Sequence, residues 1–252
     1  MLIATTTLIS ILFFGNPEEI FLIGALEKGI KKEISDKDTR KEIKTLIAAY
    51  EKSVKDFKKK RKSQKKELSG LYSSKNSSDD DFSTLFNEMY TTLNNLQLEA
   101  IHTRIKTLNM ISEEEWKNMV QIEKDRLTKL ETKSIKSKNK EKDPKPFSNL
   151  EAVIQSLGLD AQTEKESIQH LNAVRVSYDD LVHTVQDSRD KFSQIILDKN
   201  SSRTELESVA KWNNQIKKDA YFNLVDLYNT LSENVPDEKW AKVAKEFGKI
   251  LK

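Results

Sequence analysis

Cysteine is missing from this sequence, and glycine and proline are scarce. The 252 residues contain no Cys, six Gly and four Pro, while 33% are charged and 37% are hydrophobic. The lack of Cys excludes disulfide bonds and thiolate chemistry. The composition is typical of long exposed helices rather than of sheets. The 43 Lys and Arg residues nearly balance the 40 Asp and Glu residues, so we expect no nucleic acid partner.

Motifs of catalysis and of metal binding are also missing. No Gly-rich phosphate loop, nucleophile elbow or pattern of paired catalytic carboxylates occurs. Glu99-x-x-His102 is half of the Glu-x-x-His signature of di-iron bundles, but the sequence has no second pair. We therefore expect a protein without enzymatic activity, without a cofactor and without a metal ion.

The chain begins with an uncharged stretch, residues 1–15. A helix over this stretch would be about 21 Å long, shorter than the roughly 30 Å hydrocarbon core of a membrane. Asn16 as N-cap and Pro17 as first residue predict that a second helix follows. We interpret 1–33 as a membrane anchor with an interfacial helix. A cleaved signal peptide and a buried first helix of a soluble fold are the alternatives. The expected location is at a membrane, in the periplasm or envelope, with the side of the membrane open.

Apolar residues at steps of three and four predict long amphipathic helices through most of the remaining chain. Such stripes must pack against one another, which predicts an all-α fold of long antiparallel helical hairpins with coiled-coil-like seams. A stretch rich in Lys and Pro separates two sets of helices. The predicted organisation is a hydrophobic segment (1–33), a first helical unit (34–132), a Lys/Pro linker (133–147) and a second helical unit (148–252).

An internal repeat is indicated by the tetrapeptide Lys-Asn-Ser-Ser, which occurs at 75–78 and at 199–202. The two copies are 124 residues apart, and so are Trp116 and Trp240. Farther upstream, Tyr50 to Arg61 match Tyr178 to Arg189 with an offset of 128, which requires a four-residue deletion in the second copy. The repeat predicts two tandem hairpin-plus-helix units. Each Lys-Asn-Ser-Ser segment would connect the two helices of a hairpin and cap the second one.

Four residues stand out as candidates for special roles. Arg61 and Arg189 fall on the apolar stripes at matched positions, so we interpret them as register-setting or interaction residues; outward snorkelling of the guanidinium is the alternative. Trp116 and Trp240 are interpreted as structural residues of a third helix that closes its own hairpin. A basic run at 58–66 contains no aromatic side chain between its Lys residues, so we interpret it as a solvated helix face, not a nucleic acid site.

The segments 111–116 and 235–240 resemble the L-T-x-x-Q helix start of bacterial periplasmic Spy/CpxP-like proteins and related heavy-metal sensors. In this chain Ile-Ser or Val-Pro replaces Leu-Thr, and Trp replaces Gln. The resemblance implies an all-helical protein on long hairpins, with chaperone-like activity in some members.

The expected function is therefore a membrane-associated helical binding protein that holds a protein partner or client polypeptide. A structural coiled-coil scaffold or adaptor without catalytic activity is the alternative. Exposed apolar patches would favour the first, and a fully polar surface the second.

Overall fold

The computed structural model describes residues 29–122, 145–187 and 194–250, and the described chain is helical with no strand. The prediction of an all-α fold is confirmed. The labelled elements are α4 (Lys37–Ser73), α5 (Asp79–Leu108), α7 (Lys145–Ser156), α8 (Ala161–Asp187), α10 (Arg203–Asn234) and α11 (Asp237–Ile250). Shorter helical segments cover 29–33, 113–122 and 194–197.

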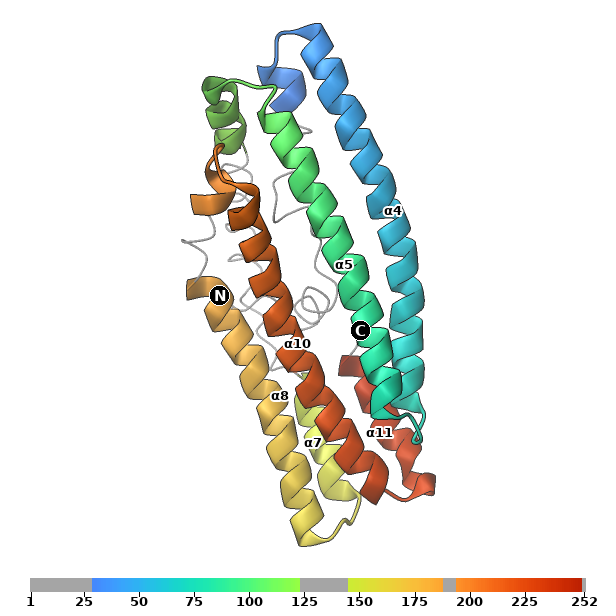
Figure 1. Ribbon diagram of the computed structural model, residues 1–252. Coiled ribbons are helices and arrows are strands. Elements are labelled where there is room, and N and C mark those ends of the chain that lie inside the picture. Colours follow the sequence, from blue (N-terminus) through green and yellow to red (C-terminus); the bar gives the residue numbers. More distant parts are fainter. Residues whose placement is uncertain (1–28, 123–144, 188–193, 251–252) are drawn as a thin grey trace.

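The four longest helices lie side by side and form an elongated body (Figure 1). Their order across the body is α4, α5, α10, α8, with each helix packed on the next. The connector between α4 and α5 lies at one end of the body, and the connector between α8 and α10 lies at the other. Helices α7 and α11 pack together at the first of these ends, and α11 also lies against α4.

The starts of the long helices are fixed by short polar side chains. Ser78 and Ser202 each form a capping box, in which the serine hydroxyl accepts from the backbone N–H of Asp81 or Glu205 and the acid accepts in return. These hydrogen bonds lower the pKa of both carboxyl groups. Both Lys-Asn-Ser-Ser segments therefore end in a helix cap, because serine satisfies N–H groups that the helix leaves without partners.

The caps also correct the predicted alignment of the two halves. Asp36 accepts from the backbone N–H of Thr39 at 2.7 Å, and Asp160 accepts from that of Thr163 at 3.0 Å, so these caps are 124 residues apart too. The offset of 124 applies both to these caps and to Ser78 and Ser202 at the start of the next long helix, so the four-residue deletion is wrong. Arg61 consequently corresponds to Val185 and not to Arg189.

Two apolar clusters form the core, one toward each end of the body. The first cluster contains Leu68, Phe82, Leu171, Tyr228 and Trp240, and the second contains Ile43, Ile101, Trp116, Met119 and Leu206, among others. Each cluster takes residues from both halves of the sequence. The first cluster is drawn mainly from the second half and the second cluster mainly from the first half, and residues of the other half complete each of them.

The segment 29–33 belongs to the second cluster. Ile30 is 1% exposed and Ile34 is 2% exposed. A Cβ placed on Gly29 would lie 2.4 Å from Cγ of Met119, so glycine allows this segment to approach 113–122 closely. The predicted boundary after residue 33 thus cuts through packed structure, whereas residues 1–28 lie outside the described part. Among the described helices, none is long and apolar enough to cross a membrane.

Two glycines provide a matched test of this close approach. Gly29→Ala is expected to lower the free energy of unfolding by about 1–3 kcal/mol, because the added methyl group overpacks Met119. Gly70→Ala is expected to raise it by about 0.5–1 kcal/mol, because Gly70 lies inside α4 with open space around its Cα. Urea denaturation followed by circular dichroism measures both. Equal effects of the two substitutions would contradict the packing of 29–33 on 113–122.

Candidate functional site

The residues predicted from the sequence meet at two junctions, each between a hairpin connector of one half and the third helix of the other half. The Trp240 junction joins Ser73, Ser74 and Lys75 to α10 and α11. The Trp116 junction joins Leu197, Asp198 and Lys199 to the end of α5 and to 113–122. The first lies at the α11 end of the body and the second at the opposite end (Figure 1).

At the Trp240 junction, three side chains of the second half bind the first connector. Trp240 Nε1 donates to the carbonyl oxygen of Ser73 at 2.9 Å, and the Tyr228 hydroxyl donates to that of Ser74 at 2.9 Å. Lys75 Nζ lies 2.6 Å from the carboxylate of Asp237. Trp240 and Tyr228 are buried, so their hydrogen bonds are shielded from water. Carbonyl groups at the end of α4, which have no partner within the helix, are satisfied in this way.

At the Trp116 junction, the first half binds the second connector through contacts at the corresponding positions. Trp116 Nε1 donates to the carbonyl oxygen of Leu197 at 2.8 Å, and Arg104 Nη2 donates to that of Asp198 at 3.0 Å. Lys199 Nζ lies 3.9 Å from the carboxylate of Glu113. Every donor and acceptor is 124 residues from its counterpart at the Trp240 junction. The two halves therefore clamp each other reciprocally.

This reciprocity corrects one expectation about the two Trp residues. They are buried structural residues, at 3% and 6% exposure, but their third helices do not close only their own hairpins. The indole of Trp240 contacts Tyr228 of its own half and bonds Ser73 of the other. The expectation was incomplete because a period of three and four identifies the buried face of a helix without identifying the helix that covers it.

The two junctions differ at one position, where Arg104 corresponds to Tyr228. Arg104 is fully buried, and its guanidinium carbon lies 5.0 Å from the centre of the Trp116 ring. Burial lowers the pKa of Arg104 to about 10, so the side chain is still charged at neutral pH. A carbonyl dipole and the face of an indole ring both stabilise a cation. At the other junction the Tyr228 ring packs edge-on against the Trp240 ring, with 5.5 Å between the ring centres.

Of the other predicted pair, the described structure contains Arg61. Arg61 is half-buried in α4, with its guanidinium carbon 5.8 Å from the centre of the Phe57 ring. Burial lowers the pKa of Arg61 to about 10. Arg189 lies outside the described residues. A register or interaction role for Arg61 stays a prediction, but a cause shared with Arg189 is no longer needed, since the two positions do not correspond.

A buried polar pair does connect two long helices, at residues that were not identified from the sequence. Gln97 of α5 and Asn214 of α10 are 1% and 2% exposed. Their amides exchange two hydrogen bonds, from Asn214 Nδ2 at 2.6 Å and from Gln97 Nε2 at 3.2 Å. The signal was present, because Gln97 follows Leu93 by four residues and Asn214 follows Ala210 by four, so both lie on apolar stripes.

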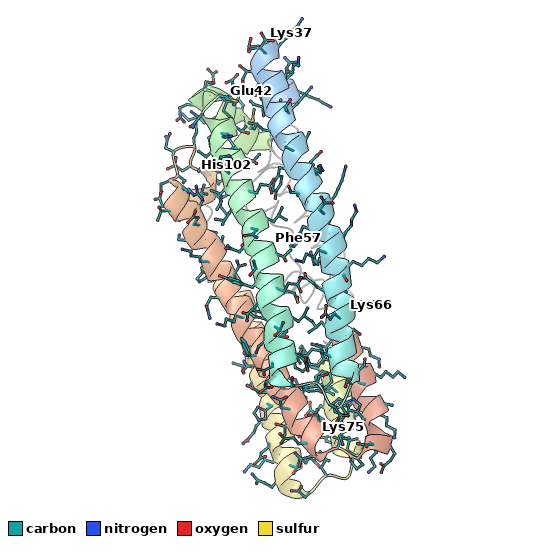
Figure 2. The ribbon with its side chains drawn as sticks, turned by 45° about the vertical axis from the view of Figure 1, so that its right-hand side comes forward. Lys37, Glu42, Phe57, Lys66, Lys75 and His102 are labelled. Atoms are coloured by element: carbon teal, nitrogen blue, oxygen red, sulfur yellow. The ribbon has the colours of Figure 1, made fainter. Side chains whose placement is uncertain are left out.

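The half-signature Glu99-x-x-His102 is not part of a metal centre within the described structure. The carboxylate of Glu99 accepts from Ser53 Oγ at 2.7 Å and thereby links α5 to α4. His102 is exposed on the outer side of α5 (Figure 2). Among the described residues, no group of three His, Asp or Glu side chains is arranged to hold a metal ion.

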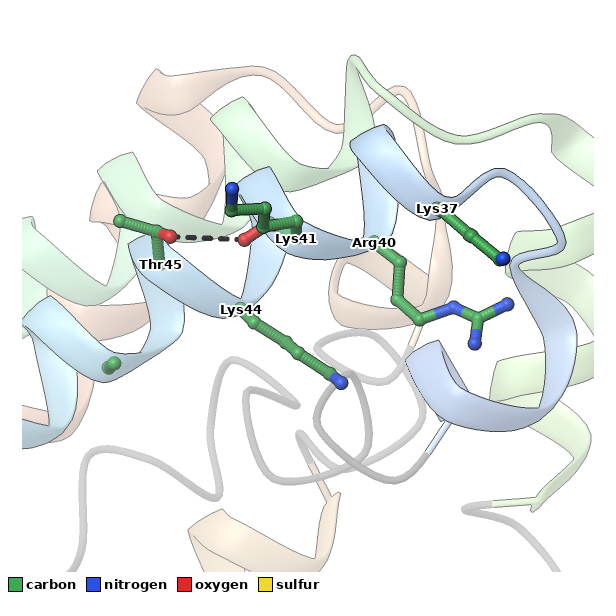
Figure 3. Close-up of a pocket in the computed structure, with 6 residues that line it drawn as sticks. Lys37, Arg40, Lys41, Lys44 and Thr45 are labelled. Atoms are coloured by element: carbon green, nitrogen blue, oxygen red, sulfur yellow. Dashed lines mark hydrogen bonds between the residues drawn. The ribbon is translucent and has the colours of Figure 1, made fainter.

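A basic depression of about 410 Å³ lies along the first turns of α4. Lys37, Arg40, Lys41, Lys44 and Thr45 line it (Figure 3). The guanidinium of Arg40 donates to the carbonyl oxygen of Ile34, at 2.6 and 3.1 Å, so this residue has a structural task at the turn before α4. Lys37, Lys41 and Lys44 are exposed. It is the beginning of a longer basic surface on the same helix.

No family model, no curated protein and no solved structure matches this chain. The resemblance of 111–116 and 235–240 to the helix start of Spy/CpxP-like proteins therefore stays a prediction.

The junctions predict that the two halves unfold together. Trp116→Ala and Trp240→Ala should each lower the free energy of unfolding by about 3–5 kcal/mol. The corresponding Phe variants should cost about 1–3 kcal/mol, because a carbonyl group loses its donor. Urea denaturation should show one transition that shifts as a whole. Tyr90→Ala, at an exposed aromatic residue, serves as control and should cost less than about 1 kcal/mol. Two separate transitions, or small losses in both Ala variants, would contradict the reciprocal clamp.

The amide pair yields a double-mutant cycle. Gln97→Leu and Asn214→Leu should each cost about 1–3 kcal/mol, because each leaves a buried amide without its partner. The double variant should recover most of that loss, since an apolar seam needs no polar partner, while its hairpins pair less uniquely. Thermal melts and amide hydrogen exchange measure the two effects. Simple addition of the two single losses would rule out a direct coupling.

Proposed function

We propose that this chain is a non-catalytic helical scaffold or adaptor, which binds its partners through a charged outer surface. One observation carries the proposal. Among the described residues, the exposed large hydrophobic side chains are those of Tyr90 and Val176, at 36% and 56%. The apolar stripes are otherwise turned inward, into the two clusters. A surface of this kind favours the scaffold over a protein that holds unfolded clients.

The architecture supports the same proposal in a second way. Four long helices are held in a fixed order by packing along their lengths and by a clamp at each end. Such a body presents long, straight faces whose charges keep constant spacing. It has no loop cluster within its described part that would suit a mobile binding site. We also propose that the chain associates with a membrane, because residues 1–15 carry no charge.

A client-aggregation assay tests the scaffold against the client-holding alternative. The full chain is mixed in equal molar amount with a reduced, aggregating model protein, and light scattering is followed at low and at high salt. The scaffold is expected to leave aggregation unchanged at high salt, because salt screens contacts between exposed charges.

Suppression of aggregation that persists at high salt would contradict the scaffold and support apolar client binding. The double variant Tyr90→Lys with Val176→Lys is the matched control, because it removes the two exposed hydrophobic side chains. If the original chain suppresses aggregation and this variant does not, the client surface lies at those two residues.

A further inference from the structure

A straight row of lysines runs along the outer face of α4. Its members are spaced by three or four residues, with Ala48 as the single interruption, and all eight are exposed. They are Lys37, Lys41, Lys44, Lys52, Lys55, Lys59, Lys62 and Lys66. We call this row the lysine face. Lys37 and Lys66 mark its two ends in Figure 2.

The lysine face points away from the helices of the described structure that pack on α4. The buried residues of α4 run from Ile43 to Tyr72, and their stripe lies about 140° around the helix from the lysines. From Lys37 to Lys66 the row is about 44 Å long, at 1.5 Å per residue. The row lies on one continuous helix, α4, from Lys37 to Ser73. All eight ammonium groups can therefore approach one flat surface together.

The second half of the chain provides an internal comparison. The positions 124 residues after the eight lysines carry a single Lys, at 165; the others are Ala161, Ile168, Val176, Asp179, His183, Gln186 and Asp190. Helix α4 has 13 Lys and Arg residues against five Asp and Glu. Helix α8 has two against five. A solvated helix face needs no such excess of one charge, since α8 occupies the equivalent place without it.

The excess is also unfavourable for the helix itself. Like charges at spacings of three and four residues destabilise a helix, and the lysine face contains six such neighbouring pairs. Lys59 of this row forms an ion pair with Asp56 at 3.5 Å, and both side chains are largely exposed to solvent. A polyanionic partner would remove the repulsion. This identifies the lysine face as an interaction surface with negatively charged material.

We propose that the lysine face binds the headgroup surface of an anionic lipid bilayer. The proposal rests on the scaffold function, whose charged partner it names. Lysine suits a diffuse layer of negative charge, whereas arginine would be expected where individual phosphates are held by paired hydrogen bonds. A straight row fits a plane better than the curved backbone of a nucleic acid duplex. The uncharged residues 1–15 precede the row in the same chain, and stable membrane attachment takes two such signals, one apolar and one basic.

Vesicle co-sedimentation with the full chain tests the proposal. Vesicles of phosphatidylcholine alone are compared with vesicles in which about a third of the lipid is phosphatidylserine. The chain is expected to bind the anionic vesicles at least tenfold more strongly, because each Lys near the surface adds to the attraction. Raising the salt should abolish this preference. Binding to neutral vesicles measures the contribution of the apolar segment separately.

The decisive variant reverses three charges of the row, Lys44→Glu, Lys55→Glu and Lys66→Glu. Its matched control, Lys165→Glu, Lys211→Glu and Lys242→Glu, changes the net charge equally at exposed positions of α8, α10 and α11. The first variant is expected to lose at least tenfold in binding to anionic vesicles, and the control to stay within about twofold. Circular dichroism melts verify that both variants are folded.

Three results would overturn the proposal. Equal losses in the two variants would reduce the effect to net charge, and equal binding to both vesicle types would remove the anionic preference. Stronger binding to polyglutamate or duplex DNA than to anionic vesicles, lost in the first variant, would assign the face to an acidic protein or a nucleic acid. These results are independent of the scaffold function, which fails instead when the chain suppresses client aggregation at high salt.

Discussion

The structure depends on how the backbone carbonyl groups at the ends of helices find hydrogen-bond donors. The last carbonyl groups of a helix have no partner within it, and at a buried end they need a donor from elsewhere. Here the donor is an indole N–H from the opposite half of the chain, at both connectors. Each indole also fills an apolar cluster to which both halves contribute. These two attachments connect the two halves at opposite ends of the body, where the two clusters lie.

The two halves have the same order of helices and corresponding junction contacts, but they differ in residue composition. Phe82 and Phe86 in one cluster correspond to Leu206 and Ala210 in the other, and the aromatic Tyr228 corresponds to the charged Arg104. One end of the body is therefore held by a network of stacked and edge-on rings, and the other by aliphatic packing around a buried cation. The outer faces differ in the same way, since the lysines belong to α4 and not to α8. Hydrogen bonds to backbone carbonyl groups recur at both ends of the body, although the surrounding side chains differ.

The sequence was sufficient for the helices, the connectors and the importance of both Trp residues. The serines of the Lys-Asn-Ser-Ser segments cap helices as their chemistry predicts, and Trp116 and Trp240 are buried. The hydrogen-bond partner of each Trp could not be predicted. Every residue has a backbone carbonyl group, so the residue types do not show which one accepts the hydrogen bond. The offset of 128 failed for a related reason: Tyr50 and Tyr178 match in type, but the caps at Asp36 and Asp160 define which positions share a place in the fold.

The reciprocal clamp has a consequence for the timing of folding during synthesis. Trp116 bonds a carbonyl group that lies 81 residues later in the chain. At a synthesis rate of about 5–20 residues per second, the indole waits about 4–16 s before its acceptor exists. During that interval the first half holds most of the second cluster but only Leu68, Tyr72, Phe82, Leu85 and Phe86 of the first. These five apolar side chains lack their partners from the second half until those residues are synthesised. The first half is thus synthesised several seconds before all of its contacts can form. The rate of translation, rather than the rate of helix formation, sets how long its apolar side chains stay exposed.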